Sequence, residues 1–310
     1  MKIGLQLICF DWPGSPNNTS LKLAEIAKTA DKAGFYSLWV MDHFFQMGGV
    51  FGSAEAPMLE GYTAISYLAG LTQQIKLGVL VTGNLYRHPG ILVKSVTTLD
   101  VLSGGRAYFG IGAGWYEREA KGLGVPFPSL KERFERLEEA LQITHQMWQG
   151  DTSPYHGKHY QLSEPINHPP PLSQPHPPIL IGGEGEKKMM PLIARYGDAC
   201  NFYFGATPNE WPESHKARYQ SRLDHLHKKL DILEKHCNKI GRSFKDIEKT
   251  VLGTIKLSSD GIDATDVIEL CRELTELGFH HVIFNMPNVL DIKPLEIFGQ
   301  EIIPVVNKFV

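Results

Sequence analysis

The chain has 310 residues and a formal net charge of −3, and 42% of its residues are hydrophobic while 21% are charged. These values are typical of a globular domain with a sizeable core, and they give no reason to expect nucleic acid or an anionic membrane as a partner. No apolar segment reaches the roughly 20 residues of a membrane-spanning helix, and no signal-peptide pattern is present, so we expect a cytoplasmic protein. Its four cysteines lie far apart without a CxxC pair and are expected to be reduced thiols.

Strand-like apolar segments alternate with helix-like amphipathic segments almost from end to end. In chain order, each expected strand and the helix that follows it are 2–8 with 21–33, 36–41 with 61–72, 75–81 with 89–102, 106–112 with 132–149, 178–182 with 187–196, 198–204 with 212–240, 249–257 with 264–277, and 281–285 with 294–308. This alternation is typical of parallel strands joined by helical crossovers.

Eight strand–helix units predict an α/β fold, a (β/α)8 TIM barrel with insertion loops, as one domain over residues 1–310. The segment 154–178 is rich in proline and histidine and is expected to be an extended loop within that domain. A linker between two domains is the alternative for this segment. An open doubly wound sheet is an alternative for the whole fold, although no GxGxxG motif follows the first strand.

Asp42 and His43 stand directly after the second expected strand. In a TIM barrel the carboxyl ends of all strands form one face, and active sites lie there. Histidine titrates near neutrality and therefore suits proton transfer. Asp42 and His43 are thus the candidate catalytic residues. The alternative is a strand end that is capped by Asp42 and followed by a half-buried His43.

Polar residues also follow the third expected strand. Thr82 and Asn84 have side chains that can hydrogen-bond a ligand, and Arg87 can neutralise an anion. The alternative is an ordinary loop that leads to Pro89 at the first turn of the next helix.

Glycine-rich turns follow the fourth and fifth expected strands. In the first turn, 112–115, small residues would let a ligand approach the backbone closely. The alternative is close packing between helix and strand, which explains these small residues equally well. The second, 182–185, precedes a helix, so its N–H groups and the helix dipole are typical of a phosphate site, with Lys187 and Lys188 adding charge. Together with the proton-transfer pair, these turns predict a pocket for a long phosphorylated cofactor, which the residues alone do not identify.

Four segments carry a resemblance to a known family: 33–44 with its Asp-His pair, 77–89 with Tyr-Arg-His-Pro, 98–117 with Leu-Ser-Gly-Gly-Arg and Gly-Ala-Gly-Trp, and 177–183. Over nearly its whole length the chain resembles the bacterial luciferase-like monooxygenase superfamily, and within it the branch that uses coenzyme F-420, a 5-deazaflavin. The third segment is the most specific for the superfamily, whereas Asp-His points less firmly to the deazaflavin branch.

This resemblance implies an oxidoreductase that transfers a hydride between C5 of the deazaflavin and a small organic substrate. An FMN-dependent monooxygenase that uses reduced flavin and oxygen is one alternative, and a non-catalytic flavin-binding protein is another. A homodimer is compatible with the resemblance. The substrate and the direction of hydride transfer are not identified.

The resemblance also implies roles for individual residues. Asp42 and His43 would lie beside the deazaflavin ring, and the Val79–Leu80 bond would be a cis peptide behind the ring. The cofactor-binding candidates are Asp42, His43, Val79, Leu80, Thr82, Gly112, Ala113, Gly114, Trp115, Gly182, Gly183 and Glu184. Sugar-phosphate dehydrogenases of this branch have a carboxylate where this chain has Trp115. The acid–base pair is therefore expected to be incomplete, and the substrate surface flatter and more apolar.

Overall fold

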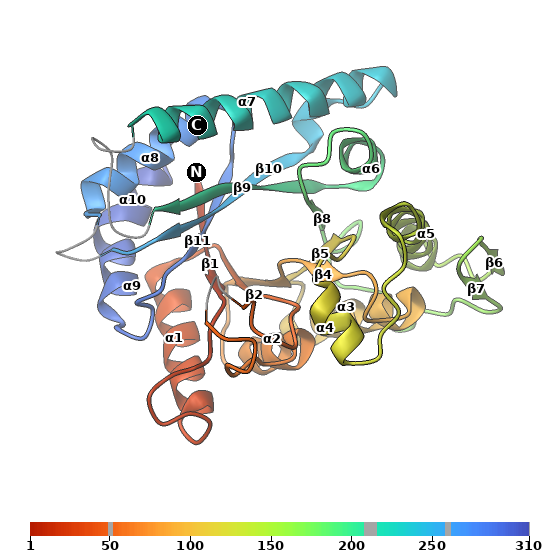
Figure 1. Cartoon of the computed structure of the whole chain (residues 1–310), viewed down its shortest axis with the longest axis horizontal. Coiled ribbons are helices and arrows are strands. Elements are labelled where there is room, and N and C mark those ends of the chain that lie inside the picture. Colours follow the sequence, from red (N-terminus) through yellow and green to blue (C-terminus); the bar gives the residue numbers. More distant parts are fainter. Residues whose placement is uncertain (49–51, 208–215, 258–261, 310) are drawn as a thin grey trace.

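The computed structural model describes residues 1–48, 52–207, 216–257 and 262–309. Within this part of the chain, parallel strands form a closed barrel at the centre of the molecule (Figure 1). Its strands are β1 (Lys2–Leu7), β2 (Ser37–Val40), β3 (Lys76–Val79), β5 (Ala107–Gly112), β8 (Ile179–Gly182), β9 (Ala199–Thr207), β10 (Glu248–Ile255) and β11 (His281–Asn285). Neighbouring strands are hydrogen-bonded in the order β3, β2, β1, β11, β10, β9, β8 and β5. The additional pairing of β3 with β5 closes this sheet into a cylinder. The predicted (β/α)8 barrel is confirmed.

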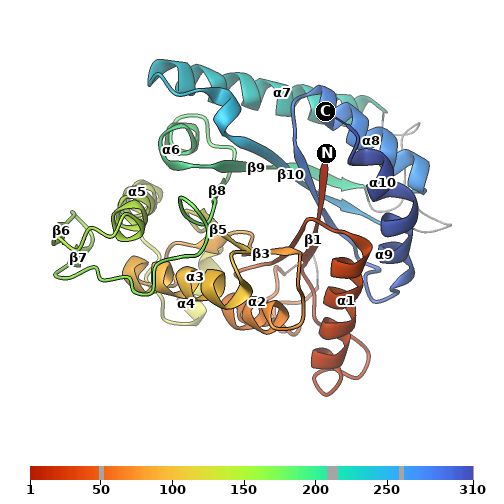
Figure 2. The same cartoon turned by 180° about the vertical axis from the view of Figure 1, so that it is seen from behind.

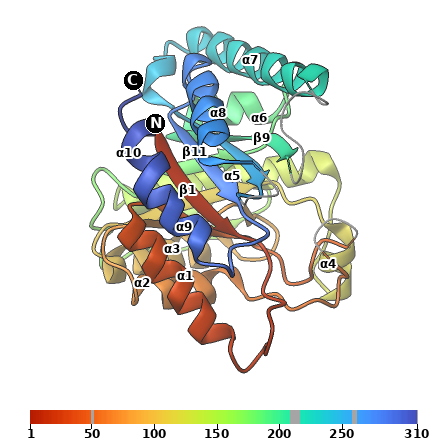
Figure 3. The ribbon, with the colours of Figure 1, turned by 90° about the vertical axis from the view of Figure 1, so that its left-hand side faces the viewer.

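Helices surround the barrel. They are α1 (Thr19–Ala33), α2 (Gly61–Ala69), α3 (Pro89–Ser103), α5 (Leu130–Trp148), α6 (Met189–Tyr196), α7 (Lys216–Lys239), α8 (Ala264–Glu276), α9 (Lys293–Ile297) and α10 (Ile303–Val306). Seen from behind, α2 and α3 cover the same side of the barrel (Figure 2), and a view from the side shows α1, α8, α9 and α10 outside β1 and β11 (Figure 3). Among the helices described here, none has the length and apolar character needed to span a membrane.

Three segments differ from the expected elements. The third strand is split into β3 and β4 (Thr82–Gly83), and a cis peptide bond between Leu80 and Val81 lies in the gap. A short helix, α4 (Glu117–Gly122), follows β5, and the expected loop 154–178 contains a hairpin of β6 (Tyr155–His156) and β7 (Gln161–Leu162). The expected helix 212–240 is observed from Lys216, and residues 212–215 lie outside the described residues.

The inside of the barrel is filled by a cluster of large side chains. Trp39 is completely buried there, beside Tyr108, Leu80 and Leu180. Its indole fits because the neighbouring strand has Gly78 at this level, where a Cβ would lie 2.4 Å from Cζ3 of Trp39. Since close packing fills this part of the barrel, a ligand has to bind above the cluster, at the carboxyl ends of the strands.

Candidate active site

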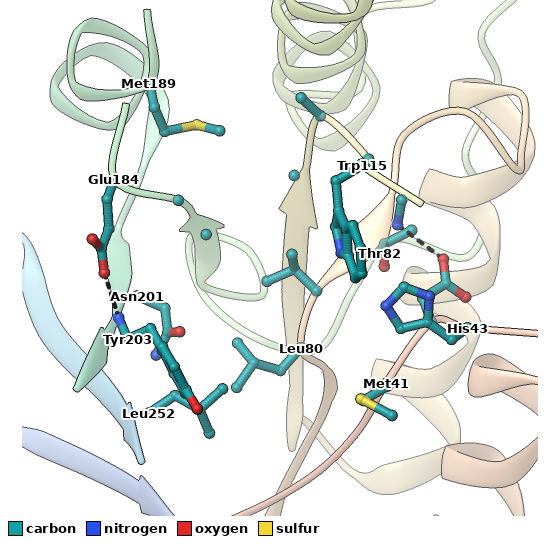
Figure 4. A pocket seen from close by; sticks show the side chains of 18 of the residues that line it. Met41, His43, Leu80, Thr82, Trp115, Glu184, Met189, Asn201, Tyr203 and Leu252 are labelled. Atoms are coloured by element: carbon teal, nitrogen blue, oxygen red, sulfur yellow. Dashed lines mark hydrogen bonds between the residues drawn. The ribbon is translucent and has the colours of Figure 1, made fainter. Parts of the chain in front are cut away.

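A cavity of about 820 Å³ opens above the packed interior, at the carboxyl ends of the barrel strands. Figure 4 shows His43, Thr82 and Trp115 on one side of it, Glu184 and Tyr203 on the opposite side, and Leu80 between them. The predicted convergence of distant strand tips on one cavity is therefore confirmed. A cavity of this size and shape is typical of cofactor and substrate sites.

Almost all the candidate residues line this cavity. Those that do so are Asp42, His43, Leu80, Thr82, Gly112, Ala113, Gly114, Trp115, Gly182, Gly183 and Glu184. Their roles toward a ligand stay predictions. Val79 is the exception, since it lies within β3 and is only 1% exposed.

The expected position of the cis peptide bond was wrong by one residue. The cis bond joins Leu80 to Val81, not Val79 to Leu80. Val79 keeps its regular pairing with Val40, and pairing resumes where Thr82 meets Ile111. The Leu80 carbonyl accepts a hydrogen bond of 2.7 Å from the Gln6 side chain, which fixes this wall of the cavity.

Packing against Val81 explains two of the glycines that we had linked to ligand binding. A Cβ on Gly112 would lie 3.0 Å from Cγ2 of Val81, and a Cβ on Gly182 would lie 2.9 Å from its Cγ1. The Gly183 N–H is also occupied, because it donates to the Asn201 carbonyl at 3.2 Å. Close packing therefore explains why positions 112 and 182 are glycine, and the phosphate role of the turn stays a prediction.

Asp42 is held in a structural ion pair and does not bond to His43. Its buried carboxylate accepts two hydrogen bonds from Arg87, at 2.8 and 2.9 Å, and one from the Gly83 N–H at 2.9 Å. Burial raises the pKa of Asp42, and the hydrogen bonds from Arg87 and Gly83 oppose this effect. Asp42 therefore joins the end of β2 to the loop after β4, and its catalytic role beside His43 stays a prediction.

The other polar residues after the third strand either bond to neighbouring side chains or do not line the cavity. Arg87 additionally contacts Glu60 and lies over the Tyr62 ring, so it is not available to an anion in the cavity. The Thr82 hydroxyl is hydrogen-bonded to the Tyr62 hydroxyl at 2.8 Å. Asn84 is buried and does not line the cavity. Arg87 and Thr82 thus support the wall of the site, and the role of Thr82 as a ligand contact stays a prediction.

Glu119, on α4, is the carboxylate that pairs with His43. Its Oε1 lies 3.2 Å from Nδ1 of His43 and accepts a hydrogen bond from the Tyr86 hydroxyl. Its Oε2 accepts the N–H groups of Phe44 and Phe45 at 2.5 and 2.7 Å. This network fixes the loop that carries His43. The position at which the sugar-phosphate dehydrogenases have a carboxylate is Trp115 here, so the expectation of an incomplete acid–base pair stays a prediction.

The surroundings keep Glu119 ionised. Its side chain is completely buried, and burial alone would raise its pKa. Hydrogen bonds from His43, the Phe45 amide and Tyr86 outweigh this effect and lower the pKa of Glu119. A carboxylate at this position accepts a hydrogen from Nδ1, so the second ring nitrogen, Nε2, is the one left for chemistry.

Two aromatic rings flank the His43 imidazole. Trp115 lies edge-on to it, with ring centroids 5.6 Å apart, and Tyr116 lies at 5.7 Å. Trp115 also stacks on Tyr116 and exposes 60% of its surface. Because Trp115 also lines the cavity, the wall beside His43 is flat and apolar, as the sequence led us to expect.

Sequence reasoning missed Glu119 although it lies only five residues after Gly114. Glu117 and Glu119 both follow the glycine-rich turn, and nothing in their order marks one of them as buried. The available signal was position, since any carboxylate after a barrel strand tip can reach the active-site face. The short helix α4 turns Glu119 inward and leaves Glu117 exposed.

Comparison with known proteins gives a family and several relatives. The family model for luciferase-like monooxygenase matches residues 7–255. An F-420-dependent glucose-6-phosphate dehydrogenase of Nakamurella multipartita is 24% identical over 91% of each chain.

Two solved structures show the same fold over nearly the whole chain. A coenzyme F-420-dependent tetrahydromethanopterin reductase from Methanopyrus kandleri has a TM-score of 0.75 and 19% identity, with 98% of both chains covered. The oxygenating constituent of 3,6-diketocamphane monooxygenase from Pseudomonas putida, a type II Baeyer-Villiger monooxygenase in complex with FMN, has a TM-score of 0.74 and 17% identity, with 100% of this chain and 99% of that chain covered. At these identities the likeness shows the fold.

Proposed function

The chain belongs to the luciferase-like monooxygenase family, and from this premise we propose that it is an oxidoreductase dependent on coenzyme F-420. Its substrate would be a small organic molecule with a flat, apolar body. The relative from N. multipartita, named as dependent on F-420, supports the choice of cofactor. The observation that carries the proposal is the Glu119–His43 pair at the edge of the cavity.

The cavity suits a flat, partly polar heterocycle. Leu80 offers an apolar surface between its two walls. Asn285, from the end of β11, is only 3% exposed and lines the cavity, and its Oδ1 has no protein partner among the described residues. A ring N–H or hydroxyl would satisfy this buried oxygen. The residues present therefore fit a deazaflavin or a flavin.

When bound, coenzyme F-420 supplies a two-electron carrier that gives or takes a hydride. The chain supplies position and a proton. Glu119 accepts the hydrogen of Nδ1 and thereby fixes the tautomer and orientation of His43. Nε2 of His43 then donates a proton to a substrate oxygen, or accepts one from it, according to the direction of the reaction. Trp115 offers a flat apolar surface beside this nitrogen, on which the substrate would lie.

A second candidate function is that of an FMN-dependent monooxygenase. The P. putida monooxygenase, solved with FMN, shares the fold and favours this alternative. Neither Leu80 nor Asn285 distinguishes a flavin from a deazaflavin, since both ring systems are flat and carry a ring N–H.

Titration of the purified apoprotein with F-420 and with FMN, each followed by fluorescence, separates the two candidates. We expect tight, saturable binding of F-420 and much weaker binding of FMN. Preferential tight binding of FMN together with oxygen-dependent turnover would contradict the proposal. A His43→Ala variant should bind F-420 with nearly unchanged affinity, because the imidazole acts on the substrate.

A further inference from the structure

The charged residues that line the cavity are not balanced within the protein. The lining carboxylates are both occupied: Asp42 by Arg87, and Glu184 by the Tyr203 N–H at 2.7 Å and by His225 at 2.7 Å. The lining also contains the guanidinium groups of Arg133 and Arg222. In the part of the chain that the structure describes, neither group contacts a carboxylate.

Arg222, on α7, is held firmly by the backbone. Its Nε donates to the Phe204 carbonyl at 2.8 Å and its Nη2 donates to the Tyr203 carbonyl at 2.7 Å. Within the described residues, its Nη1 has no protein partner. The guanidinium is thus fixed at the cavity wall with hydrogen-bond donors to spare, an arrangement suited to an anion with several oxygens.

Tyr203 links this arginine to the glycine turn after β8. Its N–H binds the Glu184 carboxylate, while its carbonyl binds Arg222. Within that turn, Gly182 packs on Val81 and the Gly183 N–H is already bonded, so neither offers a donor to a phosphate. Glu186 adds no free negative charge, since Lys229 binds it at 2.9 Å. Among the described residues at this end of the cavity, Arg222 is therefore the lining group whose charge has no carboxylate partner.

We propose that Arg222 binds the phosphate of the cofactor, so that the phosphate site is formed by α7 against the end of β9. This inference rests on the proposed function, because it takes the cofactor to be a phosphorylated deazaflavin. Arg133 is the second lining guanidinium. It binds the Gly114 carbonyl and lies over the Phe127 ring with Cζ 4.3 Å from the centroid, next to a different wall of the cavity.

The test compares two ligands that share the same ring. F-420 carries the phosphate and an acidic tail, whereas 8-hydroxy-5-deazariboflavin carries the ring and sugar alcohol without charge on the side chain. An Arg222→Gln variant removes the positive charge and keeps an amide that can still donate to a backbone carbonyl. We expect the dissociation constant for F-420 to rise about 10- to 100-fold, as for the loss of one charge-assisted hydrogen-bond pair. The dissociation constant for the uncharged 8-hydroxy-5-deazariboflavin should stay within about twofold of its wild-type value. The 5′-phosphate of 8-hydroxy-5-deazariboflavin, which has no tail, should lose affinity in the variant as F-420 does; unchanged binding of this phosphate would assign Arg222 to the tail and overturn the inference.

Controls make the outcome specific. Arg195→Gln removes an equal charge from an exposed arginine of α6 that pairs with Glu138, and it should change neither dissociation constant. Arg222→Lys keeps the charge and should restore part of the affinity for F-420. Raising the salt concentration should weaken F-420 binding to the wild type more than to Arg222→Gln.

Three further outcomes would overturn the inference. Equal weakening of both ligands would show that Arg222 only shapes the wall, and unchanged F-420 affinity would show that the phosphate binds elsewhere. If Arg133→Gln weakened F-420 binding and Arg222→Gln did not, the phosphate site would lie at α5. Failure of the wild type to bind either deazaflavin would instead refute the proposed function, and this inference with it.

Discussion

Replacing Glu119 by glutamine tests the network that holds His43 in place. The carboxylate accepts four hydrogen bonds, from the Phe44 and Phe45 amides, the Tyr86 hydroxyl and Nδ1 of His43. In Glu119→Gln one oxygen remains for the two backbone amides, and an NH₂ group faces Tyr86 and His43. Each hydrogen bond loses the contribution of the negative charge.

The cost follows from the difference between charged and neutral hydrogen bonds. A bond to a charged group contributes about 1.5–3 kcal/mol and a neutral one about 0.5–1.5 kcal/mol. With four bonds affected, we expect the free energy of unfolding to fall by about 2–4 kcal/mol at neutral pH. The NH₂ group also requires Nδ1 of His43 to become an acceptor, so the imidazole hydrogen should move to Nε2.

Urea unfolding of the wild type and the variant across a pH series measures this effect. The pKa of Glu119 is lowered from 4.5 in the fold, so its stabilisation is complete above pH 4.5 and is lost as the pH falls through the folded-state pKa. The difference between wild type and Glu119→Gln should therefore shrink below pH 4.5. Glu117→Gln is the matched control, because Glu117 is exposed on the same helix and pairs only with Lys121 within the described residues.

Two results would refute this reasoning. One is a Glu119→Gln protein as stable as Glu117→Gln at neutral pH. The other is a stability difference that stays constant well below pH 4.5, since the charge of Glu119 would then not be its source. Nitrogen NMR of the imidazole gives an independent reading, because an unchanged tautomer would show that Glu119 does not set the state of His43.

Three further predictions concern other parts of the molecule. His43→Ala should keep F-420 affinity within a few-fold while turnover falls by about 100-fold, as for loss of a general acid–base, and unchanged turnover would remove His43 from the mechanism. Gly182→Ala should lower the free energy of unfolding by about 1–3 kcal/mol, because its Cβ would clash with Val81. In the double variant, Val81→Ala should recover much of this loss. No recovery would show that the loss comes from the backbone and not from contact with Val81. Burial lowers the pKa of His281 from 6.5 to about 4, so protonation of this residue in the unfolded state should cost the wild type about 3 kcal/mol of stability between pH 6.5 and 4. His281→Gln should therefore lose less stability than the wild type over this range, by about that amount, in urea unfolding; equal losses would contradict the prediction.

The local pattern of the sequence was sufficient for the architecture. Alternation of apolar runs with amphipathic helices reports which residues are buried within each element, and this property depends on near neighbours. Eight such units leave few ways to close a parallel sheet, so the barrel and the face that carries His43 could both be predicted. The glycine-rich turns were also placed correctly beside the cavity.

The partner of each charged group was decided by the tertiary structure. Asp42 is adjacent to His43 in sequence but binds Arg87, while Glu119 reaches His43 from a helix 76 positions away. Such pairing depends on the positions of helices and strands in the folded protein. The residues next to a charged group in the sequence do not indicate its partner. The same holds for Gly112 and Gly182, whose missing side chains make room for Val81, which lies between β3 and β4. The sequence thus determined the barrel and its active face, and three-dimensional contact between distant segments decided which groups remain free for chemistry.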